Sequence, residues 1–198
     1  MLSGGDSWSD GVWAPPGRYR LVLEADGFKA ATTLEVMPDP RVLLPATAYQ
    51  QEFELARQIE ALRTRVEPVL GKARPLLQAI AARGGEAPPR LQPAIAAAAA
   101  RVSELSGVVL VPGNPANGWW LSPKGTHHLR YVSQALDALA EAVDGADAAP
   151  SPDARASFAN LEKLSAAAIA AFEAFEKGEL TKLDRQLAAA KLKPVGGG

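Results

Sequence analysis

Apolar and polar residues alternate along two short segments near the start of the chain. Residues 18–24 and 28–36 both follow the two-residue period of an extended strand. Between them, Asp26-Gly27 is a pair typical of tight turns between antiparallel strands. The pattern therefore predicts a β-hairpin. The alternating positions include Tyr19, Leu21, Leu23, Thr32, Leu34 and Val36.

A hairpin of this length is marginally stable in water by itself, because two strands bury little apolar surface. The rest of the sequence offers only a weak candidate for a further strand, Val108–Val111. We therefore expect the hairpin to be the end of a β-sandwich whose earlier strands lie upstream. The alternative is that the hairpin packs on the helical part of the chain.

A proline-rich joint, Met37–Val42, separates the hairpin from the remainder of the chain. Pro38 and Pro40 fix two φ angles, remove two backbone donors and push the preceding residues toward extended geometry. A helix or a central strand does not cross such a segment comfortably. We predict a stiff, extended joint between two domains: residues 1–42, with the hairpin and the joint, and residues 43–198, with the helices.

Beyond the joint, apolar residues recur every three or four positions, which is the spacing of one helix face. Thr47 followed by Gln50 fits a capping box at a helix start, and the helix is expected to end near Arg83-Gly84-Gly85. Pro68 and Pro75 lie within it and are expected to bend or interrupt it. The apolar stripe consists of Leu55, Ile59, Leu62, Val66, Val69, Ala73, Leu76 and Ile80.

The same rhythm predicts three more helices. Two run over about residues 90–105 and 129–143, and the third begins at Ser151-Pro152, an N-cap followed by proline at the first helical position. Lys177-Gly178 is expected to stop that helix. A short helical segment with Leu180, Leu183 and Leu187 comes next, and residues 193–198 are expected to fray.

Short connections between successive helices favour antiparallel neighbours. The predicted fold class is therefore α+β, mainly α, with a short N-terminal β-hairpin followed by an antiparallel four-helix bundle.

Composition narrows the range of partners. The 198 residues carry a net charge of −1, and the pI is near 6.2. This balance argues against nucleic acid or an anionic membrane as the main partner, since both need a clustered basic surface. The chain has no cysteine for disulfides or thiolate metal sites, and its apolar runs fall short of the roughly 20 residues of a membrane span. Residues 1–10 lack the features of a signal peptide, which predicts a cytoplasmic location if the chain is complete.

One irregular stretch, Pro112–Gly125, lies inside the helical half and holds adjacent tryptophans, Trp119 and Trp120. Tyr131 follows shortly after. Neighbouring aromatic rings on a loop can stack on a sugar ring or grip a peptide; the alternative is that one or both plug the end of the bundle. This stretch is the candidate ligand site of the sequence. Its polar neighbours are Asn114 and Asn117.

The only histidines are adjacent, His127 and His128. Neighbouring residues on a regular helix point about 100° apart, so these two cannot jointly bind one metal ion from a helix. We predict a solvated helix start and no metal site.

Three pairs of carboxylates are candidates for acid–base chemistry: Glu52 with Glu54, Glu173 with Glu176, and Asp144 with Asp147. All fall on expected solvated helix faces or helix ends, whereas glycoside hydrolysis needs two carboxylates facing each other across a cleft. The glycine pairs lack the following Lys-Ser/Thr of a phosphate-binding loop. The sequence therefore indicates neither a cofactor nor a catalytic residue.

Three motifs together resemble a known family. They are Gly11-Val-Trp-Ala-Pro-Pro-Gly-Arg-Tyr-Arg-Leu-Val-Leu, the Asp26-Gly27 turn, and Leu34-Glu-Val-Met-Pro-Asp-Pro-Arg-Val before a long helix. This series resembles the C-terminal region of bacterial BNR-repeat, sortilin-like β-propeller proteins, which are often labelled glycosyl hydrolase-like or WD/YVTN/BNR-like repeat proteins. The match runs from Trp13 to about Ile80, and the later helices are similar in style only.

The resemblance implies that the hairpin ends an Ig-like segment behind a propeller. It also implies an exported parent protein, periplasmic or secreted. The propeller repeats, in which any family activity would reside, do not occur in these residues. None of the matched motifs is catalytic, so no catalytic residue carries over.

Our favoured hypothesis is a non-catalytic C-terminal interaction or structural module of such an exported protein. It would dock on the propeller or on another protein through the hairpin edge and the bundle. The first alternative is a small carbohydrate- or peptide-binding protein that uses Trp119, Trp120, Tyr131 and Asn117. The second alternative is a hydrolase, either with a site between hairpin and bundle or with a glycoside hydrolase-related activity that resides in the parent.

Overall fold

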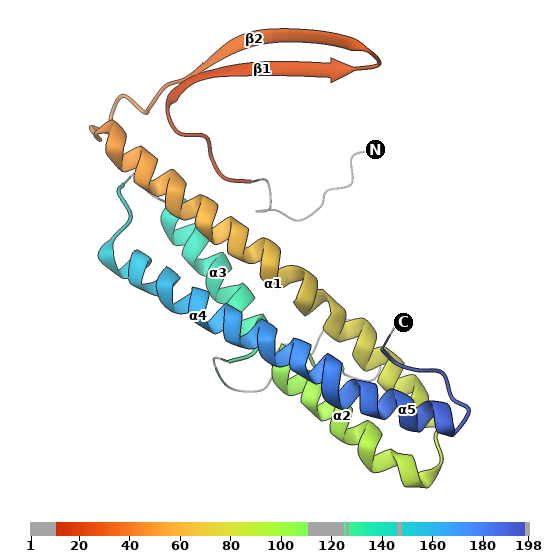
Figure 1. Ribbon diagram of the computed structural model, residues 1–198. Coiled ribbons are helices and arrows are strands. Elements are labelled where there is room, and N and C mark those ends of the chain that lie inside the picture. The colour runs from red at the N-terminus through yellow and green to blue at the C-terminus, as the bar shows by residue number, and fades with distance from the viewer. Residues whose placement is uncertain (1–10, 111–124, 126, 146–147, 197–198) are drawn as a thin grey trace. The chain divides into compact units, whose positions relative to one another are not determined.

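A computed structural model describes residues 11–110, 125, 127–145 and 148–196 (Figure 1). The chain is mainly helical, at 67%, with a two-stranded antiparallel hairpin followed by helices. The predicted fold class is therefore confirmed. The chain forms two compact units, one from Met1–Ala61 with Ala138–Phe158 and one from Leu62–Asp137 with Ala159–Gly198. The predicted joint lies inside the first unit.

The hairpin pairs β1, Gly17–Ala25, with β2, Phe28–Val36, in one antiparallel sheet. The register sets Ala25 opposite Phe28 and Gly17 opposite Val36. Asp26 and Gly27 form the two-residue turn, with φ angles of 50° and 80°. Two positive φ angles define a type I′ turn, whose twist matches that of the strands it joins. Among the described residues, Val108–Leu110 forms no strand, so the predicted weak candidate is wrong there.

The proline-rich joint is a turn rather than an extended segment throughout. The backbone N–H of Val42 donates to the carbonyl of Asp39 at 2.9 Å. The Asp39 carboxylate accepts from the backbone N–H of Arg41 and from both Nε and Nη2 of its guanidinium. These hydrogen bonds hold the pKa of Asp39 below its usual value. The Asp39 side chain stabilises a turn by binding the backbone two residues further along the chain. The preference of residues before proline for extended geometry does not by itself predict this turn.

In the first unit, the N-terminal part of α1, Ala46–Glu86, packs with the end of α3, Leu129–Asp144, and the start of α4, Pro152–Phe175. A hydrogen bond of 3.1 Å joins Arg155 on α4 to Gln51 on α1. The buried apolar side chains of this unit include Leu55, Ala56, Ile59, Leu139 and Val143. The hairpin contributes none of these core residues.

The helix starts of this unit were predicted with mixed success. Ser151 caps α4 as predicted, because its Oγ accepts from the backbone N–H of Ala154 at 3.0 Å. The predicted capping box at Thr47 is wrong, since α1 begins one residue earlier, at Ala46. Residue 47 is thus already inside the first turn. There the N–H of Ala48 donates to the carbonyl of Pro45.

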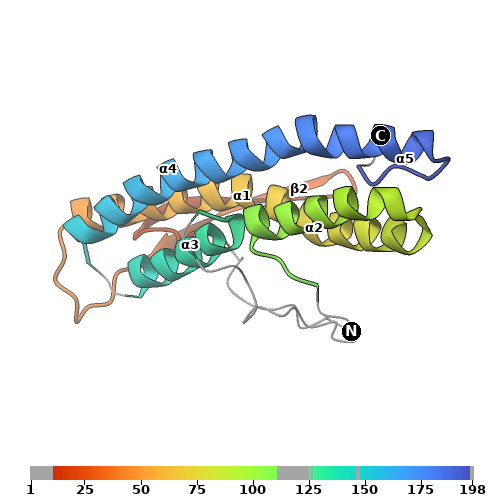
Figure 2. The same cartoon turned by 90° about the horizontal axis from the view of Figure 1, so that it is seen from below.

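The second unit contains the remainder of α1, a short 3₁₀ turn η1, Pro89–Leu91, and α2, Gln92–Ser106. It also contains the first part of α3 and a continuous helix made of the rest of α4, the π-turn η3, Glu176–Leu180, and α5, Thr181–Ala189. Both ribbon views show α2 running beside α5 (Figures 1 and 2). The side chains buried most completely include Val66, Ile80, Val102, Leu129, Val132, Leu136, Phe172 and Leu187.

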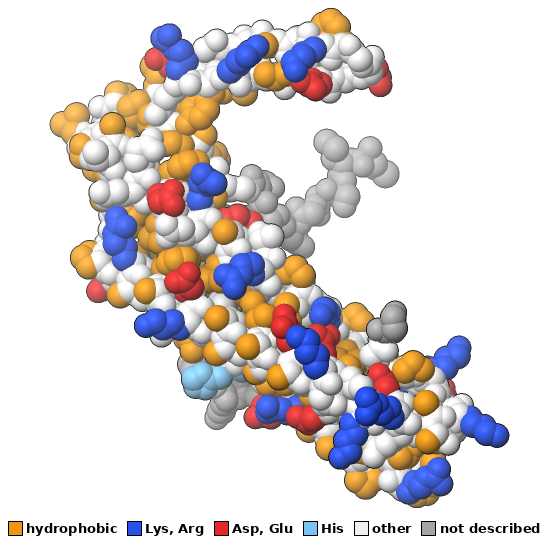
Figure 3. All heavy atoms as spheres, in the orientation of Figure 1, with side chains coloured by type: hydrophobic (Ala, Val, Ile, Leu, Met, Phe, Trp, Pro, Cys, Tyr) orange, Lys and Arg blue, Asp and Glu red, His pale blue; other side chains and the backbone are white. Residues whose placement is uncertain are grey.

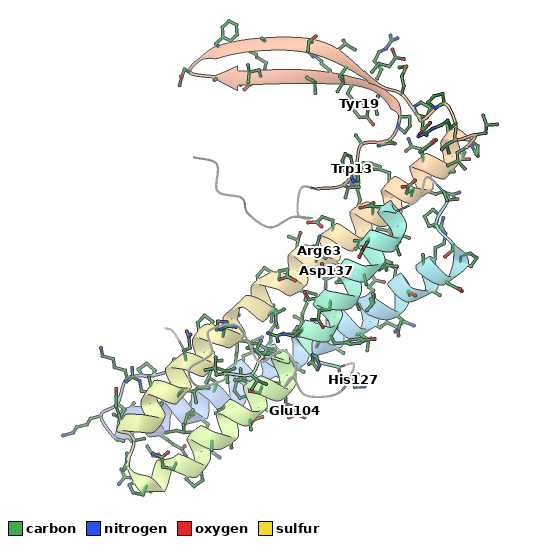
Figure 4. The ribbon with its side chains drawn as sticks, turned by 180° about the vertical axis from the view of Figure 1, so that it is seen from behind. Trp13, Tyr19, Arg63, Glu104, His127 and Asp137 are labelled. Atoms are coloured by element: carbon green, nitrogen blue, oxygen red, sulfur yellow. The ribbon has the colours of Figure 1, made fainter. Side chains whose placement is uncertain are left out.

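Ion pairs and hydrogen bonds join the helices of this unit at their margins. Lys72 on α1 binds Glu176 at 3.1 Å. Arg63 on α1 binds Asp137 on α3 at 3.0 Å, and the two side chains meet in Figure 4. The hydroxyl of Ser133 donates to Glu67 at 2.7 Å. The last two contacts place α3 against α1 in this unit. The Lys72–Glu176 ion pair is partly exposed and contributes about 1 kcal/mol or less.

The two prolines do not interrupt α1, so that part of the prediction is wrong. The helix runs for 41 residues through Pro68 and Pro75. Both prolines are exposed. The carbonyl groups four residues earlier therefore also lie at the surface, where water can bind them in place of the missing backbone donors.

The C-terminal end of the chain is more ordered than the sequence suggests. Lys177-Gly178 does not stop the helix, which passes through a π-turn into α5. Beyond α5, the carboxylate of Asp184 accepts from the backbone N–H of Val195 at 2.7 Å and of Gly196 at 3.2 Å. Val195 is buried. Residues 193–196 thus do not fray, contrary to the prediction.

The end of α2 meets the start of α3 at Gly107. This glycine ends α2, with a φ of +73°, and its N–H donates to the carbonyl of Ser103. A Cβ at this position would lie 2.4 Å from Nδ1 of His128 and 3.0 Å from Cβ of Arg130. Both the backbone conformation and the close approach of His128 therefore require glycine.

We predict that Gly107→Ala lowers the free energy of unfolding by about 2 kcal/mol or more, because alanine is strained at this φ and collides with His128. Urea unfolding followed by circular dichroism measures the change. The control is Gly71→Ala, at an exposed position of α1 with open space around it. That change should be neutral or stabilise by about 0.5–1 kcal/mol, as expected for a helix interior. Equal effects of the two substitutions would contradict the proposed role of Gly107.

Candidate functional site

The predicted aromatic loop lies mostly outside the described residues. Trp119, Trp120, Asn114 and Asn117 all fall in the range 111–124. Tyr131 lies in the first turn of α3 and is half-buried. Its ring packs edge-to-face on that of His128, with ring centres 6.3 Å apart and planes at 84°. For Tyr131 the structure shows a packing contact, and the ligand site remains a prediction.

The two histidines differ in surroundings. His127 is exposed, as predicted for a helix start, whereas His128 is buried. Nδ1 of His128 accepts a hydrogen bond of 3.0 Å from the backbone N–H of Tyr131, three residues along the chain. His128 therefore caps the start of α3, as Ser or Asp more commonly does. The prediction of a solvated residue is wrong for His128, since histidine at this position was not recognised as a cap.

The predicted carboxylate pairs do not assemble into an acid–base site in the described part of the chain. Glu173 pairs with Lys177, and Glu176 pairs with Lys72. Glu54 is exposed and accepts from Gln58. No group of three or more His, Asp or Glu side chains that could hold a metal ion occurs among the described residues. Asp147 lies outside them.

A pocket of about 180 Å³ lies in the first unit, where the base of the hairpin, the joint and α1 meet. Its walls combine apolar side chains such as Trp13 and Phe53 with the carboxylates of Asp39 and Asp144. Figure 4 shows Trp13 and Tyr19 near this base. Burial raises the pKa of Asp144, although much of that residue is exposed. The carboxylate of Asp39 is engaged by Arg41, and Tyr49 and Glu52 also line the pocket.

A second hollow, of about 360 Å³, lies in the second unit beside α4. Its floor is formed by Leu105, Leu164 and three alanines of α4, and Glu104 and His127 are among its polar lining residues, both labelled in Figure 4. Small apolar side chains dominate this surface. It offers space without a pattern of hydrogen-bonding groups that would select a ligand.

The most unusual surface among the described residues is one face of the hairpin. The register places most of the apolar side chains of both strands on one face, here called the apolar face, and Val22 and Ala31 on the other. The apolar face consists of Tyr19, Leu21, Leu23, Ala25, Phe28, Ala30, Thr32, Leu34 and Val36. Leu23 and Phe28 are 63% and 65% exposed, and Leu21 and Leu34 are nearly half exposed. Soluble proteins rarely leave large apolar side chains together in water, so such a patch indicates an interaction surface.

The opposite face of the hairpin carries most of its charges. There Arg18 lies opposite Glu35, Arg20 opposite Thr33, and Glu24 opposite Lys29. Glu24 and Lys29 form an ion pair. Basic and apolar side chains are both visible along the hairpin in Figure 3. The two faces are thus chemically distinct, as in a sheet that covers a core with one side and meets water with the other.

Comparisons with known proteins identify no relative: no family model, no curated protein and no solved structure matches the chain.

Among the helices in the described part of the chain, none has the length and apolar character needed to cross a membrane.

We predict that the cap at His128 stabilises the second unit through its Nδ1 acceptor. His128→Asn and His128→Ala both remove the ring, but only asparagine retains a side-chain acceptor that can reach the N–H of Tyr131. The asparagine variant should therefore be more stable than the alanine variant by about 1 kcal/mol in urea unfolding. His127→Ala, at the exposed neighbour, should change stability by less than about 0.5 kcal/mol. Identical stabilities for the two His128 variants would show that the ring, and not the cap, is what counts.

Proposed function

We propose that the chain is a non-catalytic interaction and structural module that docks on β-structure encoded upstream of it, through the apolar face of the hairpin. The observation that carries this proposal is the exposure of Leu21, Leu23, Phe28 and Leu34 on one side of a two-stranded sheet. A docked β-sheet would cover these side chains in the way that the second sheet of a sandwich covers the first.

The hairpin has no cover over its apolar face among the described residues. Two strands alone are marginal in water. Covering the apolar face would contribute about 25 cal/mol for each Å² of apolar surface removed from water. The hairpin is well formed, with a type I′ turn and nine paired positions on each strand. A regular sheet with an exposed apolar face is suited to bind the apolar surface of a partner.

The resemblance to the C-terminal region of BNR-repeat, sortilin-like propeller proteins supports an upstream propeller protein as the partner. In that setting the hairpin would complete an Ig-like segment behind the propeller, and the parent would be periplasmic or secreted. The helical units would then provide a second surface for the propeller or for another protein. A glycoside hydrolase-related activity, if the parent has one, would reside in the propeller and not in this chain.

The DNA upstream of Met1 provides the first test. We expect an in-frame coding region for propeller repeats followed by β-strands that lack their last hairpin, with an export signal at the start. A stop codon directly upstream, or an unrelated helical domain in frame, would rule out the proposed parent.

We predict that Leu21→Lys combined with Leu34→Lys weakens binding of the 198-residue chain to that upstream region by at least about tenfold, because both side chains would lie in the covered interface. Isothermal titration calorimetry measures the affinity. Thermal unfolding of the unbound chain should change little, since both leucines are nearly half exposed there.

The matched control for this experiment is Val22→Lys combined with Thr33→Lys. It places two new lysines on the charged face of the same strands. Affinity should then stay within a few-fold of the original. An equal loss from both pairs of substitutions would show that charge, and not the apolar face, determines binding.

A further inference from the structure

We propose that the free edge of β1 pairs with β1 of a second copy of this chain, in an antiparallel and symmetric arrangement. This pairing uses an edge of the sheet, whereas the function proposed above uses its apolar face, so the two can occur together. The argument rests on the hydrogen-bonding pattern of the hairpin and on the order of charges along one strand.

The turn determines which backbone groups face outward. In a hairpin with a two-residue turn, the pair that flanks the turn is a hydrogen-bonded pair, and pairs then alternate along the strands. Ala25 and Phe28 flank the turn. The residues of β1 that direct N–H and C=O groups to its outer edge are therefore the even-numbered ones: Arg18, Arg20, Val22 and Glu24.

Nothing in the described sheet covers this edge, because β1 has β2 as its single neighbour there. All four of these residues are exposed. An uncovered edge is a template for another strand, and native proteins commonly protect such edges with proline or with inward-pointing charges. The nine residues of β1 contain no proline.

The charge order along β1 makes this edge complementary to itself. When two antiparallel copies overlap over all nine residues, from Gly17 to Ala25, Leu21 faces Leu21 at the two-fold axis. Arg18 then lies opposite Glu24 of the other copy, and this contact occurs twice by symmetry. Arg20 lies opposite Val22, so the full-length register places no like charges directly opposite each other, and the two Arg20 side chains are diagonal neighbours. Opposite charges across a strand pair favour association, and like charges oppose it.

The same register also brings apolar side chains together. Tyr19 would face Leu23 of the other copy, again twice. These are non-hydrogen-bonded pairs, in which side chains approach most closely. The resulting four-stranded sheet would keep one continuous apolar face on the same side as in the single hairpin. Such a sheet is better able to persist than two strands alone.

The outer edge of β2 is a poorer candidate. Its outward-directed residues are Lys29, Ala31, Thr33 and Glu35. Self-pairing there would also bring opposite charges together, Lys29 with Glu35, and its large apolar pair, Phe28 with Val36, would lie at the ends of the overlap. The central pairs would be Ala30 with Leu34 and Thr32 with Thr32, which bury less apolar surface than the central Leu and Tyr pairs of β1. On β1, Arg18 and Arg20 form no ion pair within the described residues.

A strand pair is a small interface, so we expect a weak dimer with a dissociation constant between about 1 μM and 1 mM. Analytical ultracentrifugation of the full 198-residue chain, from micromolar concentration to about 1 mM, should show a monomer–dimer equilibrium. A chain that remains monomeric at the highest concentration overturns the proposal.

Charge exchange between two variants tests the register. Arg18→Glu should weaken self-association by roughly tenfold or more, because the introduced carboxylate would face Glu24 of the other copy at both contacts. Glu24→Arg should do the same by bringing arginines together. Mixing the two variants brings opposite charges together at both contacts of the mixed dimer, so the mixture should associate more strongly than either variant alone. Arg18→Glu combined with Glu24→Arg in one chain restores opposite charges at both contacts and should associate about as well as the original chain. Failure of this double variant to associate, with all variants folded by circular dichroism, overturns the proposed register.

Proline substitution tests which edge is used. Val22→Pro removes an outward N–H from β1, and Ala31→Pro removes one at the directly opposite position of β2. Both residues belong to a non-hydrogen-bonded pair, so neither change breaks the ladder inside the hairpin. We expect Val22→Pro to abolish the dimer and Ala31→Pro to preserve it. If Ala31→Pro abolishes the dimer and Val22→Pro preserves it, the dimer forms through β2. If only the combination of Leu21→Lys and Leu34→Lys abolishes it, the dimer forms through contact between apolar faces. Either result overturns the proposal.

Discussion

A single stripe of apolar side chains along α1 is the constraint on which the helical structure depends. The helix is 41 residues long and contributes to both compact units. Its buried positions recur every three or four residues, and they include Leu55, Ile59, Leu62, Val66, Ala73 and Ile80. Helices of ordinary length draw most of their stability from burying such a stripe. The other helices in each unit cover it, which leaves the opposite side free to tolerate two exposed prolines.

Much of this architecture could be predicted because strong local signals agree with the burial pattern. The Asp26-Gly27 turn specifies the hairpin, Ser151 with Pro152 specifies a helix start, and Gly107 specifies a helix end. The errors occur where a residue type has several uses. Thr47 has the chemistry of a cap but lies inside a helix, and His128 has the chemistry of a ligand but acts as a cap. These uses depend on where the helix starts in three dimensions, which spacing alone does not determine.

A functional surface is harder to predict from sequence than the fold, for a related reason. Sequence reasoning selected residues with reactive or aromatic side chains, and three of those, Trp119, Trp120 and Asp147, fall outside the described residues. The surface that carries the proposed function is built from ordinary leucines and a phenylalanine. The residue type alone does not distinguish the exposed Leu23 from the buried Leu62. The pairing of the strands shows that the apolar face of the hairpin is exposed. The signal was present in the alternation itself, combined with the scarcity of further strands.

The π-turn at Glu176–Leu180 explains why the sequence suggested a break there. Along α4 the buried residues are Leu161, Ser165, Ala168, Phe172 and Phe175, at intervals of four and three. A regular continuation would next bury residue 179, but the chain buries Leu180, Leu183 and Leu187 instead. The wide turn accommodates one residue more than an α-helix would, and so returns the later leucines to the buried side. Removing one residue from this turn should therefore leave a regular helix with its apolar side still in phase, whereas removing one from the middle of α4 would rotate everything beyond it by about 100°.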